Sequence, residues 1–137
     1  MLLRLAALSL VIACLWRADA SSYDKKGKVQ MGTWGGEHVG LWVENNRSRL
    51  EYDCARGTIE QALTIDSKGR FKAKGTHIFE GGGPTTADDE PDRHPALYAG
   101  HVAGQKMTIT ITLTDTNKTL GPYTLTYGKS PSLTKCR

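Results

Sequence analysis

The segment MTITITLT, residues 107–114, decides the fold class of this chain, because apolar and polar side chains alternate along it without a break. A period of two places every second side chain on the same face of a β-strand, so this segment predicts a strand with one buried and one wet face. The same pattern returns in RLEYDC (49–54), GRFKAKGTHIF (69–79) and PYTLTY (122–127). No stretch after Ser22 shows the apolar period of a helix, so the sequence predicts an all-β protein.

Turn residues divide the chain into strands. Gly, Asn and Asp, which tolerate positive φ, fall between most of the alternating runs. The predicted strands are eight and cover residues 32–44, 48–56, 58–66, 69–80, 96–103, 106–115, 119–128 and 132–137. Closure would remove the unpaired edges of such a meander, so we expect an eight-stranded antiparallel up-and-down barrel, with a two-sheet β-sandwich as the alternative.

The first 20 residues predict a secretory signal peptide. A short basic start, MLLR, precedes an uncharged apolar run at residues 5–16, and Ala18 and Ala20 give the small-x-small pattern that signal peptidases accept. This run is too short to span a bilayer as a helix, and no later apolar stretch is long enough either, so we expect no transmembrane segment. The prediction is a secreted or periplasmic protein.

A second interpretation of the same region is a bacterial lipobox. The residues VIAC at 11–14 would then be cleaved before Cys14, whose lipid would anchor the protein in the cell envelope. Residues 21–30 contain three lysines and predict a flexible basic arm ahead of the fold. Residues 31–137 are short enough for a single β-barrel domain.

The cysteine count supports export. Three cysteines are an odd number for an exported chain, but Cys14 falls in the signal or carries the lipid. Cys54 and Cys136 remain, and an oxidising compartment predicts a disulfide between them, with two buried thiols as the alternative. In the expected barrel they lie at the same end, two strand spacings or ~9.6 Å apart, which exceeds direct disulfide reach. The C-terminal tail must therefore curl under the first strand.

Charge and motifs argue against several classes of function. The net charge of +4 is far below the footprint of a nucleic-acid-binding protein. There is no nucleophile elbow, HExxH, phosphate loop or SxxK pattern, so we expect a non-enzyme without a cofactor. His38, His77, His94, His101 and the acidic run at residues 88–92 lack the ligand spacing of a metal site, so no metal is expected.

The tripeptide Gly32-Thr33-Trp34 opens the first predicted strand. A Gly-x-Trp motif at the start of an eight-stranded meander resembles the calycin barrels, the group of the lipocalins and avidins. The tryptophan plugs one end of the barrel in those families, so the resemblance implies that role for Trp34. The segments GTWGGEHVGLWV (32–43), LEYDCA (50–55) and LGPYTLTYG (120–128) also look like small exported bacterial barrel proteins of uncharacterised function, a likeness that implies no activity.

The first predicted strand carries two competing apolar faces. Trp34 and Trp42 share one parity, whereas Val39, Leu41 and Val43 share the other. We assign the tryptophan face to the barrel interior and expect one of the two faces to be covered by the N-terminal arm or by another subunit. The oligomeric state is left open.

A ligand pocket inside the barrel is the leading functional hypothesis. Small eight-stranded barrels either fill their interior with side chains or hold one small ligand. We expect Gly40, Ala73, Gly75 and Gly100 to leave room beside aromatic rings, and a few polar groups to orient a partly apolar molecule; a fully packed core is the alternative. The expected ligand-binding residues are Trp34, Trp42, Tyr52, Phe71, His77, Phe79, Tyr98, Tyr123 and Tyr127.

Protein interaction is the alternative function. Residues 81–95, GGGPTTADDEPDRHP, predict a long polar loop, and long loops on rigid scaffolds often carry binding surfaces. The Tyr52-Asp53-Cys54 tripeptide with Cys136 near the end is similar to the plan of some lipid-anchored periplasmic lysozyme inhibitors. That resemblance implies an inhibitor module of the cell envelope acting through the 81–95 loop, although the inhibitory motif of those proteins has no counterpart here.

Overall fold

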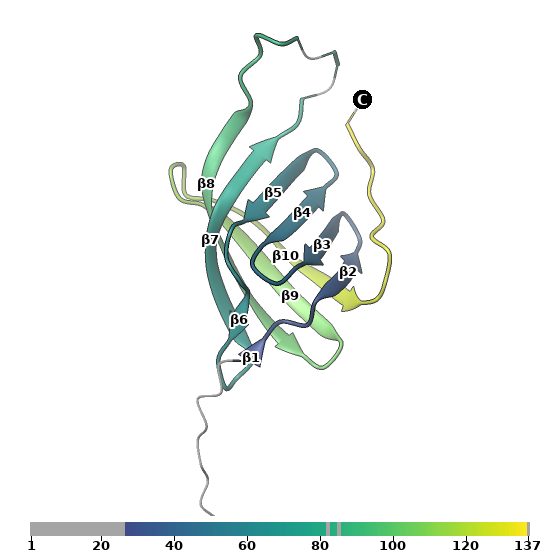
Figure 1. Cartoon of the computed structure of the whole chain (residues 1–137). Helices are drawn as coiled ribbons and strands as arrows, with labels where there is room; N and C mark the ends of the chain where they lie inside the picture. The colour runs from purple at the N-terminus through teal and green to yellow at the C-terminus, as the bar shows by residue number, and fades with distance from the viewer. Residues whose placement is uncertain (1–26, 82, 85, 137) are drawn as a thin grey trace, which may run out of the picture.

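The structure, a computed structural model, describes residues 27–81, 83–84 and 86–136. The expected signal peptide at residues 1–20, the cleavage sites and Cys14 all lie outside these residues. The described part is all-β (Figure 1). Its strands are β1 (Gly27–Lys28), β2 (Gly32–Gly36), β3 (Val39–Val43), β4 (Ser48–Tyr52), β5 (Ala55–Ile59), β6 (Thr64–Ile65), β7 (Arg70–Phe79), β8 (Asp92–Ala103), β9 (Lys106–Leu113) and β10 (Lys118–Tyr127).

Eight of these strands form a closed barrel in the order β10-β2-β3-β4-β5-β7-β8-β9, and every neighbouring pair is antiparallel. The ring closes where Thr126 and Tyr127 of β10 pair with Gly35 and Trp34 of β2. This closed ring confirms the predicted eight-stranded antiparallel barrel. The alternative, a two-sheet β-sandwich, is wrong. Closure thereby buries the core side chains without leaving a long unpaired edge.

The first predicted strand, 32–44, is wrong as one element. It is a hairpin of β2 and β3, whose turn contains Glu37 and His38, and His38 has a φ of 66°. A turn of two residues changes the parity of the inward face, which explains the two competing faces of the sequence. Trp34 points inward from β2, and the inward residues of β3 are Val39, Leu41 and Val43.

Other boundaries shift as well. The break expected between the predicted strands 48–56 and 58–66 lies instead at Asp53-Cys54, so β5 takes residues predicted for two different strands. The expected strand at 132–137 is not a strand in the part that is described, although Ser132 forms a parallel bridge with Glu37. β8 begins at Asp92, because residues 92–95 pair with β7, so the predicted loop is shorter than 81–95. The barrel still has eight strands because one predicted strand divides and another disappears.

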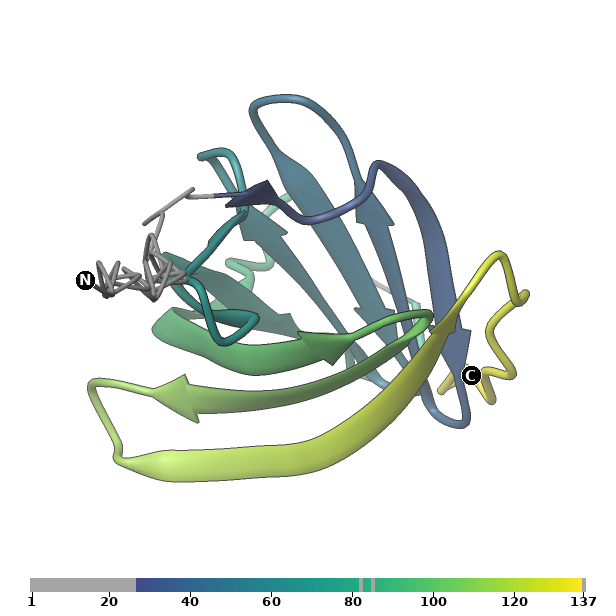
Figure 2. The same cartoon turned by 90° about the horizontal axis from the view of Figure 1, so that it is seen from below.

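The lower end of the barrel is closed by the chain that precedes β2. β1 pairs with β6 across this end, and Val29 is buried at 2% exposure (Figure 2). The Trp34 indole is fully buried, donates from Nε1 to the Gln30 carbonyl at 3.0 Å, and meets the Tyr127 ring edge-on. Residues 27–30, expected as the end of a flexible arm over 21–30, therefore belong to the fold, and residues 21–26 of that arm lie outside the described residues.

The middle of the barrel is packed, and the expectation that small inward residues leave room is wrong there. A side chain on Gly57 or Gly75 would collide with the ring of Tyr98, and one on Gly100 would collide with Phe71. The glycines thus accommodate aromatic rings rather than a ligand. The Tyr98 hydroxyl is satisfied, since it donates to the Thr76 carbonyl at 2.7 Å.

The C-terminal tail runs along the outside of β2 and β3 to the upper end of the barrel (Figure 1). Gly35 and Gly40 are paired in register on this outer face, and a side chain on either would collide with the tail at Pro131. The tail crosses the β2–β3 turn and joins Cys136 to Cys54, whose Cα atoms are 5.1 Å apart. The predicted pair forms, and the tail curls past the first strand as the barrel required.

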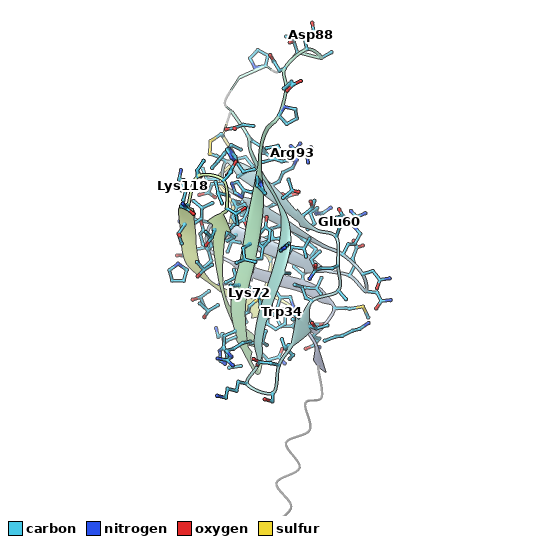
Figure 3. The ribbon with its side chains drawn as sticks, turned by 90° about the vertical axis from the view of Figure 1, so that its left-hand side faces the viewer. Trp34, Glu60, Lys72, Asp88, Arg93 and Lys118 are labelled. Atoms are coloured by element: carbon cyan, nitrogen blue, oxygen red, sulfur yellow. A yellow bond between two sulfur atoms is a disulfide. The ribbon has the colours of Figure 1, made fainter. Side chains whose placement is uncertain are left out.

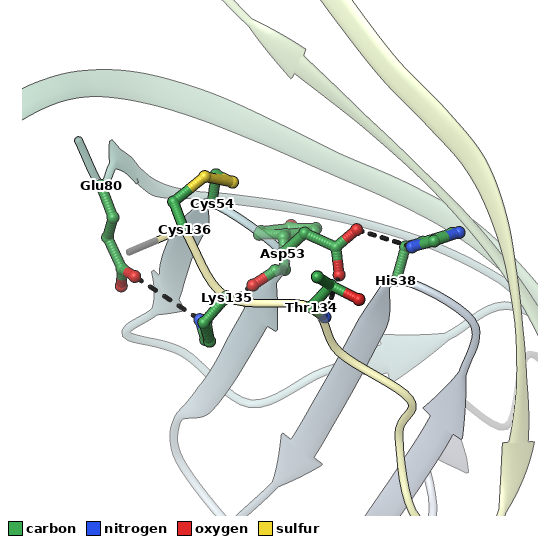
Figure 4. Close-up of a disulfide and its surroundings, with 8 residues drawn as sticks. His38, Asp53, Cys54, Glu80, Thr134, Lys135 and Cys136 are labelled. Carbon is green, nitrogen blue, oxygen red and sulfur yellow. Dashed lines mark hydrogen bonds and ion pairs between the residues drawn. A yellow bond between two sulfur atoms is a disulfide. The ribbon is translucent and has the colours of Figure 1, made fainter. Parts of the chain in front are cut away.

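Contacts of Thr134 and Lys135 also fasten the end of the tail (Figure 4). The Thr134 amide donates to the Asp53 carboxylate at 2.7 Å, and the same carboxylate meets the His38 imidazole at 2.6 Å. Lys135 lies 3.5 Å from Glu80 and donates to the Tyr52 carbonyl at 2.8 Å. The tail therefore ties together three turns that surround the upper mouth of the barrel.

Candidate ligand pocket at the barrel mouth

A cavity of about 180 Å³ opens at the upper end of the barrel, beside the disulfide. It is formed by the upper ends of β4, β5, β7 and β10. β10 pairs with β2 only at its last two residues, so its first half continues past the end of β2 and becomes one wall of the mouth. The lining residues are Tyr52, Asp53, Cys54, Ala55, His77, Phe79, Leu120 and Tyr123.

Two buried polar side chains in this lining have no hydrogen-bond partner among the described residues. His77 is fully buried and both of its ring nitrogens are unpaired; the Tyr52 hydroxyl, on a side chain that is 4% exposed in all, is unpaired too. Buried polar groups in folded proteins are nearly always paired, because an unpaired one costs about 1–3 kcal/mol. The pocket lining therefore includes two side chains whose buried polar atoms lack a geometric partner, His77 and, beside the Tyr98 hydroxyl, Tyr52.

Aromatic rings hold His77 in place. Its ring centroid lies 5.3 Å from that of Tyr52 and 4.6 Å from that of Phe79, and Tyr52 in turn lies 5.8 Å from Tyr123. The imidazole is therefore packed between two aromatic rings. The result is an aromatic bowl whose floor is formed by the side chains of His77 and Tyr52.

The floor is electrically neutral. Burial lowers the pKa of His77, and the nearby cations His94 and Lys118 act in the same direction. Burial also raises the pKa of Tyr52 well above its usual value. At neutral pH the floor therefore presents one imidazole donor, one imidazole acceptor and a phenolic hydroxyl.

Charged groups lie at the rim. His94 of β8, the register partner of His77, is held by Asp115 at 2.7 Å and by Asp92 at 2.9 Å. These carboxylates raise the pKa of His94, with the Asp115 hydrogen bond as the largest cause. Lys118 places its ammonium over the Phe79 ring, 5.1 Å from the centroid. In the described part of the chain no group of three His, Cys, Asp or Glu side chains is arranged to hold a metal ion.

The structure divides the predicted ligand-binding residues into separate groups. Tyr52, His77, Phe79 and Tyr123 line the mouth pocket. Tyr98 belongs to the packed middle. Phe71 lies near β6, where it lines a separate hollow, and Trp34 and Tyr127 belong to the lower end; these eight all face the interior. The assignment of the ninth, Trp42, to the interior is wrong.

Trp42 lies on the outer face of β3. Its side chain is half-buried, with the Arg49 guanidinium 4.7 Å from its ring centroid. Pro131 of the tail lies beside it over Gly40. The C-terminal tail thus covers part of the second apolar face of this hairpin.

Sequence reasoning missed Leu120 in the pocket wall. Alternation through Tyr123, Leu125 and Tyr127 assigns Leu120 to the outside, but the β9–β10 register shifts between Leu120 and Tyr123. This irregularity brings both side chains to the inner face. The only sequence signal is the Gly121-Pro122 pair, which interrupts the ladder.

Comparisons with known protein families, curated proteins and solved structures found no match to this chain. Across the described residues there is no helix long and apolar enough to cross a membrane. The case for a function therefore depends on the geometry and chemistry of the barrel.

The two mouth histidines predict a stability maximum near pH 6.5. The pKa of His77 is below its usual 6.5, so its contribution is present above pH 6.5 and is lost as the pH falls toward its folded pKa. The pKa of His94 is above 6.5, so its contribution is present below pH 6.5 and is lost as the pH rises through its folded pKa. Urea unfolding between pH 5 and 8 measures both limbs.

Single substitutions separate the two limbs. His77→Leu, a change of similar volume, is expected to flatten the acidic limb. His94→Gln is expected to flatten the alkaline limb and to weaken the acidic limb slightly, because His94 helps to lower the pKa of His77. The carboxylates with lowered pKa, such as Asp53 and Asp115, titrate below pH 3.8 and do not enter this range. An unchanged acidic limb in His77→Leu would contradict the assignment.

Proposed function

We propose that this protein is a non-catalytic, exported β-barrel that binds a small, partly apolar ligand in the mouth pocket. The observation that carries the proposal is His77, fully buried in the pocket lining with neither nitrogen paired among the described residues. A group of this kind destabilises the unliganded fold, so its presence at the end of a cavity is typical of a binding site. The described lining of the pocket contains no serine or threonine, and its one cysteine, Cys54, is in the disulfide, so we propose no catalytic role for the imidazole.

The size of the cavity limits the ligand. A cavity of about 150 Å³ in another protein holds one benzene molecule, and the mouth pocket has about 180 Å³. Rings of Phe79 and Tyr123 and the Leu120 side chain offer the apolar contacts, and Tyr52 and His77 offer the polar ones. The ligand is thus a single small ring or an equivalent group, held by its polar end.

We propose an exported protein because the fold contains a disulfide. The Cys54–Cys136 disulfide is compatible with an oxidising compartment, such as the periplasm or the outside of the cell. The signal-like pattern of residues 1–20 supports the same location, and the lipobox around Cys14 offers an envelope-anchored form.

Phenol titration followed by NMR tests the binding proposal. We expect saturable shifts of the His77 imidazole and of the Tyr52 and Tyr123 rings, with a dissociation constant on the order of 1 mM for so small a probe. Phenol should bind at least ~5-fold more weakly to His77→Leu, because a buried hydrogen bond is lost. Trp42→Ala, on the outer face, is the control and should bind normally. Shifts that do not saturate, or that lie outside the pocket, would refute the proposal.

The loop between β7 and β8 supports protein interaction as the second candidate. It projects beyond the barrel, with Asp88 near its tip (Figure 3). Its tip is internally bonded, since the Thr86 amide donates to the Asp89 carboxylate at 2.7 Å. Asp88, Asp89 and Glu90 give it a negative surface suited to a basic protein. Inhibition of a c-type lysozyme at equimolar protein would favour this function over ligand binding.

A further inference from the structure

The charged side chains around the mouth pocket differ in whether they have an ion-pair partner. His38 pairs with Asp53, Lys135 with Glu80, and His94 with two carboxylates. Lys118 belongs to none of the ion pairs formed among the described residues, and it lies on the Phe79 ring that lines the pocket. The mouth therefore combines a neutral floor with a cation at its edge that is not neutralised by a described carboxylate.

We propose that the ligand is a monocyclic aromatic acid with a hydroxyl group opposite the carboxylate, the hydroxyl bound at His77 and Tyr52 and the carboxylate facing Lys118. This assignment rests on the binding function proposed above. The pocket distinguishes the two ends of the molecule, because its floor is neutral and polar whereas its edge carries the Lys118 ammonium.

The hydroxyl fits the floor. A phenolic hydroxyl donates one hydrogen bond and accepts others, which matches a neutral imidazole that has one acceptor and one donor nitrogen. A carboxylate at this depth would have to lose its hydration with no buried cation to replace it. The floor therefore selects a neutral polar group.

The carboxylate fits the rim. The Lys118 side chain is exposed, so an acid beside it keeps part of its hydration while gaining the attraction of the ammonium. The ring between the two ends lies against Phe79 and Tyr123, and the volume of about 180 Å³ admits only one ring. A para arrangement places the two polar groups at opposite ends of that ring.

Three probes test the assignment by calorimetry at neutral pH and low salt: 4-hydroxybenzoate, 4-methylphenol, which lacks the charge, and benzoate, which lacks the hydroxyl. We expect 4-hydroxybenzoate to bind about 5-fold more tightly than 4-methylphenol, since a partly exposed charge pair is weak. It should bind about 10-fold or more tightly than benzoate, which leaves the floor unpaired. Added salt should remove only the advantage over 4-methylphenol.

Two variants assign the contacts. Lys118→Gln should weaken 4-hydroxybenzoate about 5-fold and leave 4-methylphenol unchanged, whereas Lys72→Gln, on the outer face of β7 and away from the mouth, should change neither (Figure 3). His77→Leu should weaken both hydroxylated probes and leave benzoate unchanged. These variants alter one end of the ligand at a time.

The outcomes separate this inference from the proposed function. If 4-methylphenol binds as tightly as 4-hydroxybenzoate, or if Lys118→Gln weakens both equally, the aromatic acid is wrong and small-molecule binding stands. If benzoate matches 4-hydroxybenzoate, the orientation is wrong. If none of the three probes binds the wild-type protein, both the inference and the binding function fail.

Discussion

Removal of the Cys54–Cys136 disulfide is expected to lower the free energy of unfolding by about 4 kcal/mol. The two cysteines are 82 residues apart, so most of the barrel sequence lies between them. When the protein unfolds, the bridge restricts the conformations of this long segment. A loop of this length loses a large conformational entropy when it is closed, and the native state gains the corresponding stability. A loss of this size is a large fraction of the stability of a small domain.

Urea unfolding of a Cys54→Ser, Cys136→Ser double variant measures the effect. Reduced wild-type protein is the matched comparison and should unfold at the same urea concentration as the double variant. Pro131→Ala, a change in the tail that keeps the bridge, should cost much less. A loss below about 1 kcal/mol in the double variant would show that the bridge does not restrain the unfolded chain as the loop-closure model requires.

Trp34→Ala is expected to destabilise the barrel by about 3–5 kcal/mol. The indole is fully buried, and its removal leaves a cavity at the closed lower end together with an unpaired Gln30 carbonyl. The variant also loses the edge-on contact between Trp34 and Tyr127, whose ring centroids are 5.2 Å apart in the wild-type structure. Nothing else in the packed lower end is free to fill a volume of that size.

Trp42→Ala provides the matched control, because Trp42 lies on the neighbouring strand but faces outward. It is half-buried between Arg49 and the tail, so its loss should cost about 1 kcal/mol. Thermal and urea unfolding of both variants give the comparison. Equal losses at the two positions would contradict the assignment of Trp34 to the interior and Trp42 to the outside.

The strands with unbroken alternation could be predicted from the sequence. β7 and β9 end within two residues of their expected positions, since period-two patterning over eight or more residues leaves no alternative register. β10 also ends close to its expected position, although its alternation is interrupted at Gly121-Pro122. The hairpin at Glu37-His38 could not be predicted in the same way. A positive φ in a turn is normally indicated by glycine or asparagine in the sequence, but here His38 adopts it. Its signature was the change of parity between Trp34 and Val39.

The pocket was predicted only in part. Four of its lining residues follow from inward parity. Whether the interior is open or filled depends on which aromatic ring packs against each inward glycine, and this is set by the folded structure. Tyr98 fills the space at Gly57 and Gly75, and no feature of the sequence specifies that contact across three strands. The missing partner of His77 is likewise a property of the packing and not of the local sequence.

The position of β1 determines how the protein can be attached to a surface. Gly27 enters the barrel at its lower end, whereas the pocket opens at the upper end beside Cys136 (Figure 1). A barrel coupled to a sensor chip or resin through residues ahead of Gly27 would hold its mouth toward the solution. Coupling through the C-terminus would turn the mouth toward the support and hinder access. N-terminal immobilisation is thus the geometry in which ligand capture should be measured.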